Sequence, residues 1–201
     1  KSSKVYKCLS INEEIALISR KKRLSIRKKF SKKYNLINSL PINLFSVTNL
    51  GHTNFFSDEE SEEIQIKLIK KIINITPQLL IMFHPSISTN QYKKTKGLFK
   101  NKIVDEPLPY LSSIIDIFIS LTETSAEQYL LPLGAECIIF YHNKSWLYGI
   151  YDNYRNLNCF KINDPKGFKR ISELNKLNFI NTSKSKYPKG KFKTFTECFF
   201  D

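Results

Sequence analysis

Several short segments of the sequence are apolar at successive positions, and this feature most limits the possible fold. They are residues 42–48 (INLFSVT), 79–83 (LLIMF), 116–120 (DIFIS) and 135–141 (AECIIFY). A strand with one solvated face alternates apolar and polar residues, whereas the strands of a parallel sheet are covered on both faces. A helical pattern follows each of the first three segments, as in consecutive β–α units. The sequence therefore predicts an α/β protein with a Rossmann-like parallel sheet and helices on both faces.

The intervening segments carry helix signals. Ser57 stands at an N-cap position and Glu60 follows three residues later, which together predict a capping box. Pro107 is suited to a helix start, because its missing N–H would have no partner there. The predicted helices are residues 10–34, 57–74, 89–99, 107–114, 124–133 and 165–177. Two shorter strands are predicted at residues 102–105 and 158–162.

The positive charge lies mainly at the two ends of the chain. The net charge is +14, and residues 1–33 hold twelve Lys or Arg against two Glu. Residues 183–201 hold five Lys against two acids, while residues 34–182 are nearly neutral. This distribution, together with the strand pattern, predicts a basic N-terminal helical segment (1–40), a Rossmann-like domain (41–182) and a basic tail (183–201). The nearly neutral middle disfavours nucleic-acid binding by the domain itself.

The basic N-terminal segment offers few apolar positions, so we expect it to contribute little to the central core. We expect contact only along one stripe, formed by Ile11, Ile15 and Ile18. Three basic residues should then lie outside the core: Arg23, Arg27 and Lys28. An exposed basic helix could face an anionic membrane surface.

Cysteine usage and hydropathy predict a cytoplasmic protein that could lie peripherally at the inner face of the membrane. The four cysteines form no CxxC pair, and Cys137 lies inside an apolar strand, as expected of a buried free thiol. No apolar run approaches the ~20 residues that span a bilayer. The first residue is Lys1, so we expect the chain to be the tail of a longer protein. Three histidines without paired cysteines predict no metal site and no cofactor.

Polar residues follow the predicted strands at the points where these strands end. Ligands of open parallel sheets bind at the carboxyl ends of the strands, so these loops are expected to lie together. Asp105 lies in one of them, directly before Glu106. The candidate substrate-binding residues are Thr48, Asn49, His52, Ser86, Glu106, Thr122, Thr124, Ser125 and Glu127, and the candidate catalytic residue is His84.

The stretch SLTETSAEQYLLPLG (120–134) has two interpretations. Helix N-termini offer backbone N–H groups and a positive dipole end that suit a phosphate, and small hydroxyl side chains add donors. Under this hypothesis the N–H groups near Thr124 and Ser125 are free and face a cleft that His84 also faces. The alternative is a capped helix in a solvated loop, and the sequence leaves both open.

This combination of motifs resembles the C-terminal, nucleotide-binding half of GT-B fold transferases that build bacterial capsule and surface polysaccharides. The sialyl- or polysialyltransferase and polyglycerolphosphate transferase groups are most similar in pattern. The resemblance covers residues 42 to about 141 and rests on the His-Pro pair at 84–85, the stretch IVDEPLPYLSSIIDIFIS and the following TETSAE and LPLG.

The resemblance implies a role for each matching position. His84 would contact the donor phosphate, Thr124 and Ser125 would bind the phosphates, and Glu127 would contact the ribose. The loop at 105–106 would hold the base. The implied function is transfer of a sugar from a nucleotide-activated donor to a glycan acceptor, with a separate N-terminal acceptor domain missing from this chain.

Two other functions remain open at this point. The same fold serves nucleotide-sugar 2-epimerases, which have a similar His-Pro loop but carry Ser-Gly-Gly where this chain has TETSAE. A non-catalytic adaptor could use the basic ends to bind nucleic acid or anionic lipid.

Overall fold

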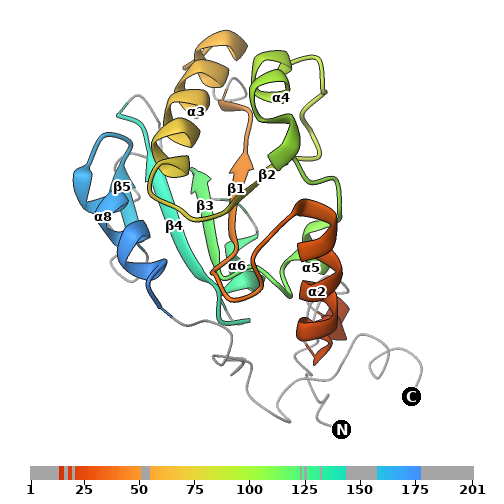
Figure 1. The fold of residues 1–201 in the computed structure, drawn as a ribbon. Helices are drawn as coiled ribbons and strands as arrows, with labels where there is room; N and C mark the ends of the chain where they lie inside the picture. The colour runs from red at the N-terminus through yellow and green to blue at the C-terminus, as the bar shows by residue number, and fades with distance from the viewer. Residues whose placement is uncertain are drawn as a thin grey trace, which may run out of the picture.

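The computed structural model describes residues 14–15, 18–19, 21–50, 55–122, 124, 126–131, 133–143 and 158–177. Within these residues, five parallel strands form one sheet in the order β2-β1-β3-β4-β5 (Figure 1). The strands are β1 (Asn43–Val47), β2 (Leu79–Phe83), β3 (Ile117–Leu121), β4 (Glu136–Tyr141) and β5 (Asn158–Lys161). The predicted α/β class and the all-parallel sheet are confirmed.

The prediction of a strand at residues 102–105 is wrong, because these residues do not form a strand. The chain there forms a 3-10 helix, η2 (Lys100–Lys102), and then a single parallel bridge from Ile103 to Ile81 on the outer side of β2. The Val104 N–H donates to the Ile81 carbonyl over 2.9 Å. If this bridge is counted as a sixth strand position beside β2, the strand order of the sheet matches that of the doubly wound nucleotide-binding fold.

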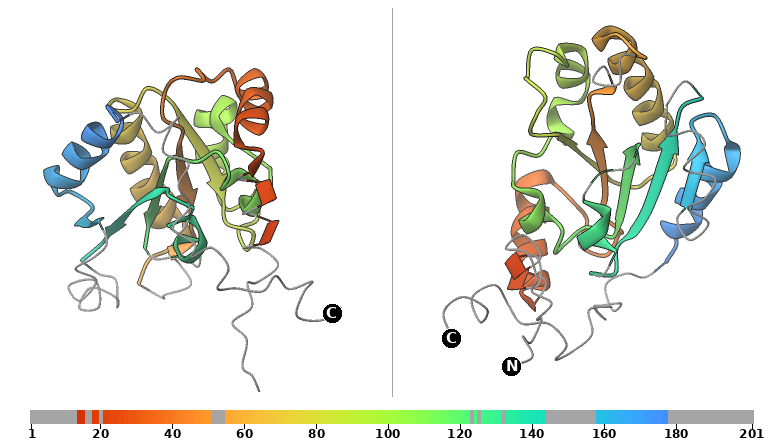
Figure 2. Two further views of the ribbon diagram at one scale, coloured as in Figure 1. Left: turned by 90° about the horizontal axis from the view of Figure 1, so that it is seen from below. Right: turned by 180° about the vertical axis from the view of Figure 1, so that it is seen from behind.

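Helices cover both faces of the sheet, as the two further views in Figure 2 show. One face is covered by α3 (Asp58–Ile73), α4 (Lys93–Phe99) and α8 (Pro165–Leu174), and the other by α2 (Arg23–Tyr34), α5 (Leu108–Leu111) and α6 (Glu127–Leu130). The strands β1 to β4 therefore contribute side chains to two separate hydrophobic clusters, one on each face of the sheet. Cys137 in β4 is a buried free thiol, as predicted, and burial raises its pKa.

The local signals in α3 and α8 explain how these helices are placed. Ser57 Oγ accepts the Glu60 N–H over 3.1 Å, and Glu60 Oε2 accepts the Ser57 N–H over 3.0 Å, so the predicted capping box is confirmed. Gly167 lets α8 approach β4 closely, because a Cβ there would lie 2.7 Å from the Phe140 ring. The predicted helices at 107–114 and 124–133 are shorter than expected, with four helical residues each.

The N-terminal helix is part of the core, which corrects our expectation for the basic segment. Ile26 and Phe30 of α2 are buried in the cluster beneath it. Arg23 and Arg27 are also buried, whereas Lys28 is exposed. The predicted stripe does not hold, because two of its members, Ile15 and Ile18, are exposed and Ile11 lies outside the described residues.

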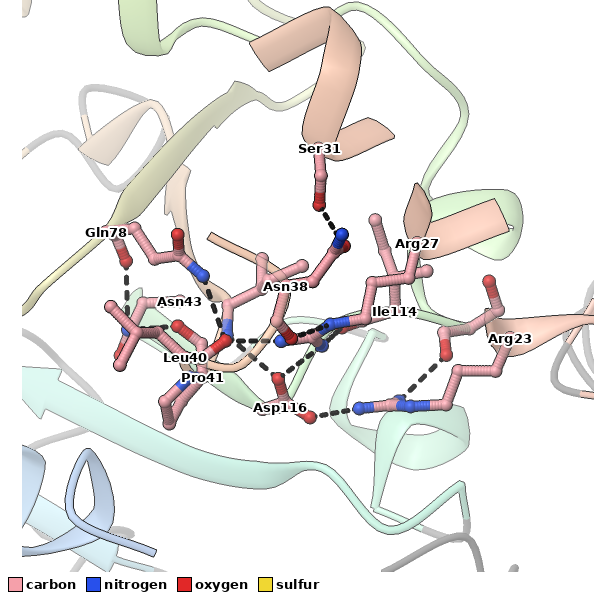
Figure 3. Close-up of polar contacts among 12 residues, drawn as sticks. Arg23, Arg27, Ser31, Asn38, Leu40, Pro41, Asn43, Gln78, Ile114 and Asp116 are labelled. Carbon is pink, nitrogen blue, oxygen red and sulfur yellow. Dashed lines mark hydrogen bonds and ion pairs between the residues drawn. The ribbon is translucent and has the colours of Figure 1, made fainter. Parts of the chain in front are cut away.

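The two arginines can be buried because an aspartate at the amino edge of the sheet forms ion pairs with both of them (Figure 3). Asp116, directly before β3, forms ion pairs with both Arg23 and Arg27 and accepts the Ile42 N–H over 2.8 Å. Arg23 also donates to the Ser113 carbonyl and Arg27 to the Asn38 carbonyl, at 2.9 and 3.0 Å. Burial lowers the pKa of Arg23 while the carboxylate opposes that shift. The network fixes α2 to the starts of β1 and β3.

Candidate functional site

A cavity of about 600 Å³ opens at the carboxyl edge of the sheet. It lies at the carboxyl end of β1, whose neighbours in the sheet are β2 on one side and β3 on the other. This is the switch point of the sheet, because the chain leaves β1 and β3 toward helices on opposite faces. The lining comes from β1, the end of β2 and its following loop, the loop before α5 and the first residues of α5, and the loop after β3: Ser46, Met82, Phe83, His84, Pro85, Ile87, Thr89, Val104, Asp105, Glu106, Pro107, Leu108, Pro109, Thr124 and Ala126. Three of the predicted loops therefore meet at one cavity.

His84 is held by both its backbone and its ring. Its N–H continues the ladder between β1 and β2 by donating to the Val47 carbonyl over 2.9 Å. Nδ1 accepts the Ser86 N–H over 3.2 Å and lies 2.7 Å from Ser86 Oγ. Because a backbone N–H can only donate, Nδ1 is the acceptor and the hydrogen of the neutral ring lies on Nε2. Nε2 makes no hydrogen bond with another described residue, so it can donate to a ligand.

Glu106 contributes a carboxylate to the cavity lining, and two residues of α2 hold this carboxylate in place. Its carboxylate accepts hydrogen bonds from Lys33 Nζ and Tyr34 Oη. Burial opposes ionisation of Glu106, but these two hydrogen bonds outweigh burial and lower its pKa. The cavity lining therefore includes a carboxylate whose ionised form is favoured and which is ion-paired with Lys33. Lys33 and Tyr34 were missed by the sequence analysis, because they stand over 70 positions away and no local pattern links them to Glu106.

At Thr124 the loop after β3 lacks the free backbone N–H that the phosphate-cradle hypothesis requires. Glu127 turns inward, and its Oε2 accepts both the N–H and the Oγ1–H of Thr124, over 2.9 and 2.8 Å. Its Oε1 accepts from buried Ser120 over 2.9 Å. Burial raises the pKa of Glu127, and the hydrogen bonds from Thr124 oppose this shift. The Glu127 carboxylate reaches back three residues to the Thr124 N–H, as the acid of a capping box does. This N–H is therefore already occupied.

The remaining predicted residues divide between supporting positions and undescribed ones. Thr48 joins the ends of two strands, since its Oγ1 donates to the Leu121 carbonyl over 3.0 Å. Tyr92 Oη donates to the Thr48 carbonyl over 3.0 Å, and Gln65 contacts the Thr48 backbone at both N–H and C=O. The cavity lining contains neither Thr48 nor the neighbouring Asn49.

Thr122 also supports the loop rather than lining the cavity. It has a positive φ of 80° and donates its N–H to the Phe140 carbonyl over 2.8 Å. His52 and Ser125 lie outside the described residues. Ser86 acts through its contact with His84 and is not itself among the lining residues.

No protein-family model and no curated protein sequence matches this chain. In the part of the chain that the structure describes, no group of three or more His, Cys, Asp or Glu side chains is placed to hold a metal ion. None of the helices described there is long and apolar enough to cross a membrane.

Proposed function

We propose that the cavity binds the nucleotide part of an activated sugar, and that the chain is the donor-binding half of a glycosyltransferase. One observation carries the proposal: the His84 loop, the 104–109 loop and Thr124 line one cavity at the switch point of a parallel sheet. That position is the usual ligand site of this fold. A volume of about 600 Å³ lies in the range of small-molecule sites.

The charges on the lining suggest an orientation for the ligand. His84 offers a hydrogen-bond donor at Nε2, which suits a phosphate oxygen. Asp105 and Glu106 offer carboxylate acceptors, which suit ribose hydroxyls or an exocyclic amine of the base. A phosphate beside Glu106 would meet a like charge. The phosphate therefore lies toward His84, with the nucleoside toward the loop before α5.

This orientation gives His84 a chemical role in direct displacement at the sugar carbon. When the bond from sugar to phosphate breaks, negative charge grows on the departing phosphate. A donor already aimed at that oxygen stabilises the transition state more than the ground state. Glu127 has no direct part in this proposal, because its two oxygens accept hydrogen bonds from Ser120 and Thr124.

Nucleotide binding can be tested on the chain alone. Thermal unfolding should be measured with CMP, CDP, UMP, UDP and GDP in turn. One nucleotide should stabilise the protein by about 2.7 kcal/mol at 100 times its dissociation constant. Absence of stabilisation by every nucleotide would contradict the proposal.

The site can then be located by calorimetry with the best nucleotide. His84→Ala should weaken binding by about 1–3 kcal/mol, because a charge-assisted hydrogen bond is lost. His142→Ala is the matched control, since His142 follows β4 and is absent from the cavity lining. Equal affinity losses in both variants would place the nucleotide elsewhere.

A further inference from the structure

The outward side of α2 is a continuous basic surface. The inward side of this helix holds Arg23, Ile26, Arg27, Phe30 and Ser31. The outward side, which we call the lysine face, consists of Lys28, Lys29, Lys32 and Lys33 with Leu24 at one end, all of them exposed. Figure 2 shows α2 at the outer rim of the molecule, so no described element covers this side. At the rise of an α-helix, the face extends over about 14 Å from Leu24 to Lys33.

The lysine face keeps its positive charge almost uncompensated. Residues 21–34 contain no Asp or Glu. Among the described residues, Lys33 is the lysine of this face with an ion-pair partner, which is Glu106 of the cavity lining. A surface of this kind favours a partner that presents many negative charges in a plane.

The side chains of the face favour lipid over nucleic acid. Arginine, which recognises phosphates and base edges with two parallel hydrogen bonds, is present in α2, but both arginines are buried against Asp116. The exposed cations are lysines, whose long stems can lie along an apolar surface while the charge stays at the headgroup level. Leu24 is 68% exposed, and an apolar residue beside lysines is typical of a helix lying in a membrane interface.

We propose that the lysine face of α2 docks the protein onto an anionic lipid surface. Leu24 enters the headgroup region and the lysines contact the lipid phosphates. Because Lys33 of this face contacts Glu106 of the cavity, the docking surface borders the candidate site. An acceptor carried on the membrane would then be held close to the cavity. The inference goes beyond donor binding and does not depend on which nucleotide the cavity accepts.

The test is co-sedimentation of the full chain with vesicles of phosphatidylcholine, alone or mixed with phosphatidylglycerol. The chain should bind the mixed vesicles and not the neutral ones, and high salt should release it. The triple variant Lys28→Gln, Lys29→Gln, Lys32→Gln should bind the mixed vesicles about 100-fold more weakly, at roughly fivefold for each lysine removed. Leu24→Ser should weaken binding by roughly tenfold.

The matched control removes three exposed lysines from the opposite edge of the sheet: Lys166→Gln, Lys169→Gln, Lys176→Gln. This variant has the same net charge as the α2 variant and should bind as the unmodified chain does. Equal losses in both triple variants would overturn the proposal in favour of net charge or the basic ends outside the described residues. An unchanged α2 variant would overturn it directly. Binding to a short nucleic-acid duplex without binding to mixed vesicles would overturn it in favour of the other class of polyanion.

Discussion

The amino and carboxyl edges of the sheet both carry polar side chains, but those side chains are used in opposite ways. At the amino edge, Asp116 is 1% exposed and its oxygens are shared between Arg23, Arg27 and the Ile42 N–H. At the carboxyl edge, His84 is exposed, and among the described residues only its Nδ1 has a hydrogen-bond partner. A buried network built on a fully shared carboxylate holds elements together, whereas a partly occupied polar group beside a cavity is available to a ligand.

Residue type alone does not separate these two uses. Asp116 and Glu106 are both acids that contact basic residues of α2. The difference lies in burial, because an uncompensated charge is costly only where water is excluded. Mutations at the amino edge should therefore change stability, and mutations around the cavity should change binding.

The largest effect is expected at Asp116. Asp116→Ala should lower the free energy of unfolding by about 3–5 kcal/mol, because it leaves two buried guanidinium groups without their carboxylate. Urea unfolding measures the change. The control is Asp105→Ala at the carboxyl edge, which is exposed and should change stability by no more than about 0.5 kcal/mol. Similar losses in the two variants would remove the distinction between the edges.

Glu127 is the exception at the carboxyl edge, since it lies near the cavity but is buried. Glu127→Ala should cost about 1–3 kcal/mol of stability, because the Ser120 hydroxyl and the Thr124 N–H lose their acceptor. Urea unfolding of Glu127→Ala and of the unmodified chain measures this cost. A cost near zero would mean that the carboxylate leaves this position in solution, where it would be available to a ligand after all.

The pH dependence at Glu127 has a defined sign. Its pKa is raised in the folded protein, so its contribution to stability is complete below the unfolded-state pKa of about 4.3 and is lost as pH rises through the folded value. Compared with Glu127→Gln, the unmodified chain should therefore be relatively more stable at acidic pH than at neutral pH. A difference that stays constant between those conditions would contradict the raised pKa.

Ser86 should affect binding and leave stability unchanged. Ser86→Ala removes the hydroxyl beside His84 Nδ1 and should reduce affinity for the best nucleotide by about 0.5–1.5 kcal/mol. The unfolding free energy should stay the same, because Ser86 is exposed. Ser86→Thr keeps the hydroxyl and should restore affinity. Failure of the threonine variant to restore it would mean that Ser86 does not act by positioning the imidazole.

The smallest effect is expected at Glu106, whose pH dependence has the opposite sign to that of Glu127. The pKa of Glu106 is lowered in the folded protein, so its contribution is present above the unfolded-state pKa and is lost as pH falls through the folded value. Glu106→Gln should therefore destabilise slightly at neutral pH and not at strongly acidic pH. Solvent screens the exposed Lys33 partner, so the change should be smaller than at Glu127. Thermal unfolding of the unmodified chain and of Glu106→Gln, at neutral and at strongly acidic pH, measures this difference.

Much of the fold follows from local patterns. The strands at 79–83, 116–120 and 135–141 were identifiable because burial on both faces requires apolar residues at successive positions. The start of α3 was identifiable because the Ser57–Glu60 capping box is complete within four residues. The site was identifiable only as a region, because parallel strands bring the loops after 83, 103 and 121 to one edge.

The sequence by itself therefore determined the α/β class, most of the elements and the edge at which the candidate site lies. Only the tertiary structure decided that Arg23 and Arg27 are buried, because their partner Asp116 is about 90 positions away and burial of a charge depends on that partner. The tertiary structure likewise decided that Glu127 faces the protein interior and Glu106 the cavity. Both are acids in polar loops, and only the packing around each one fixes which groups its carboxylate can reach.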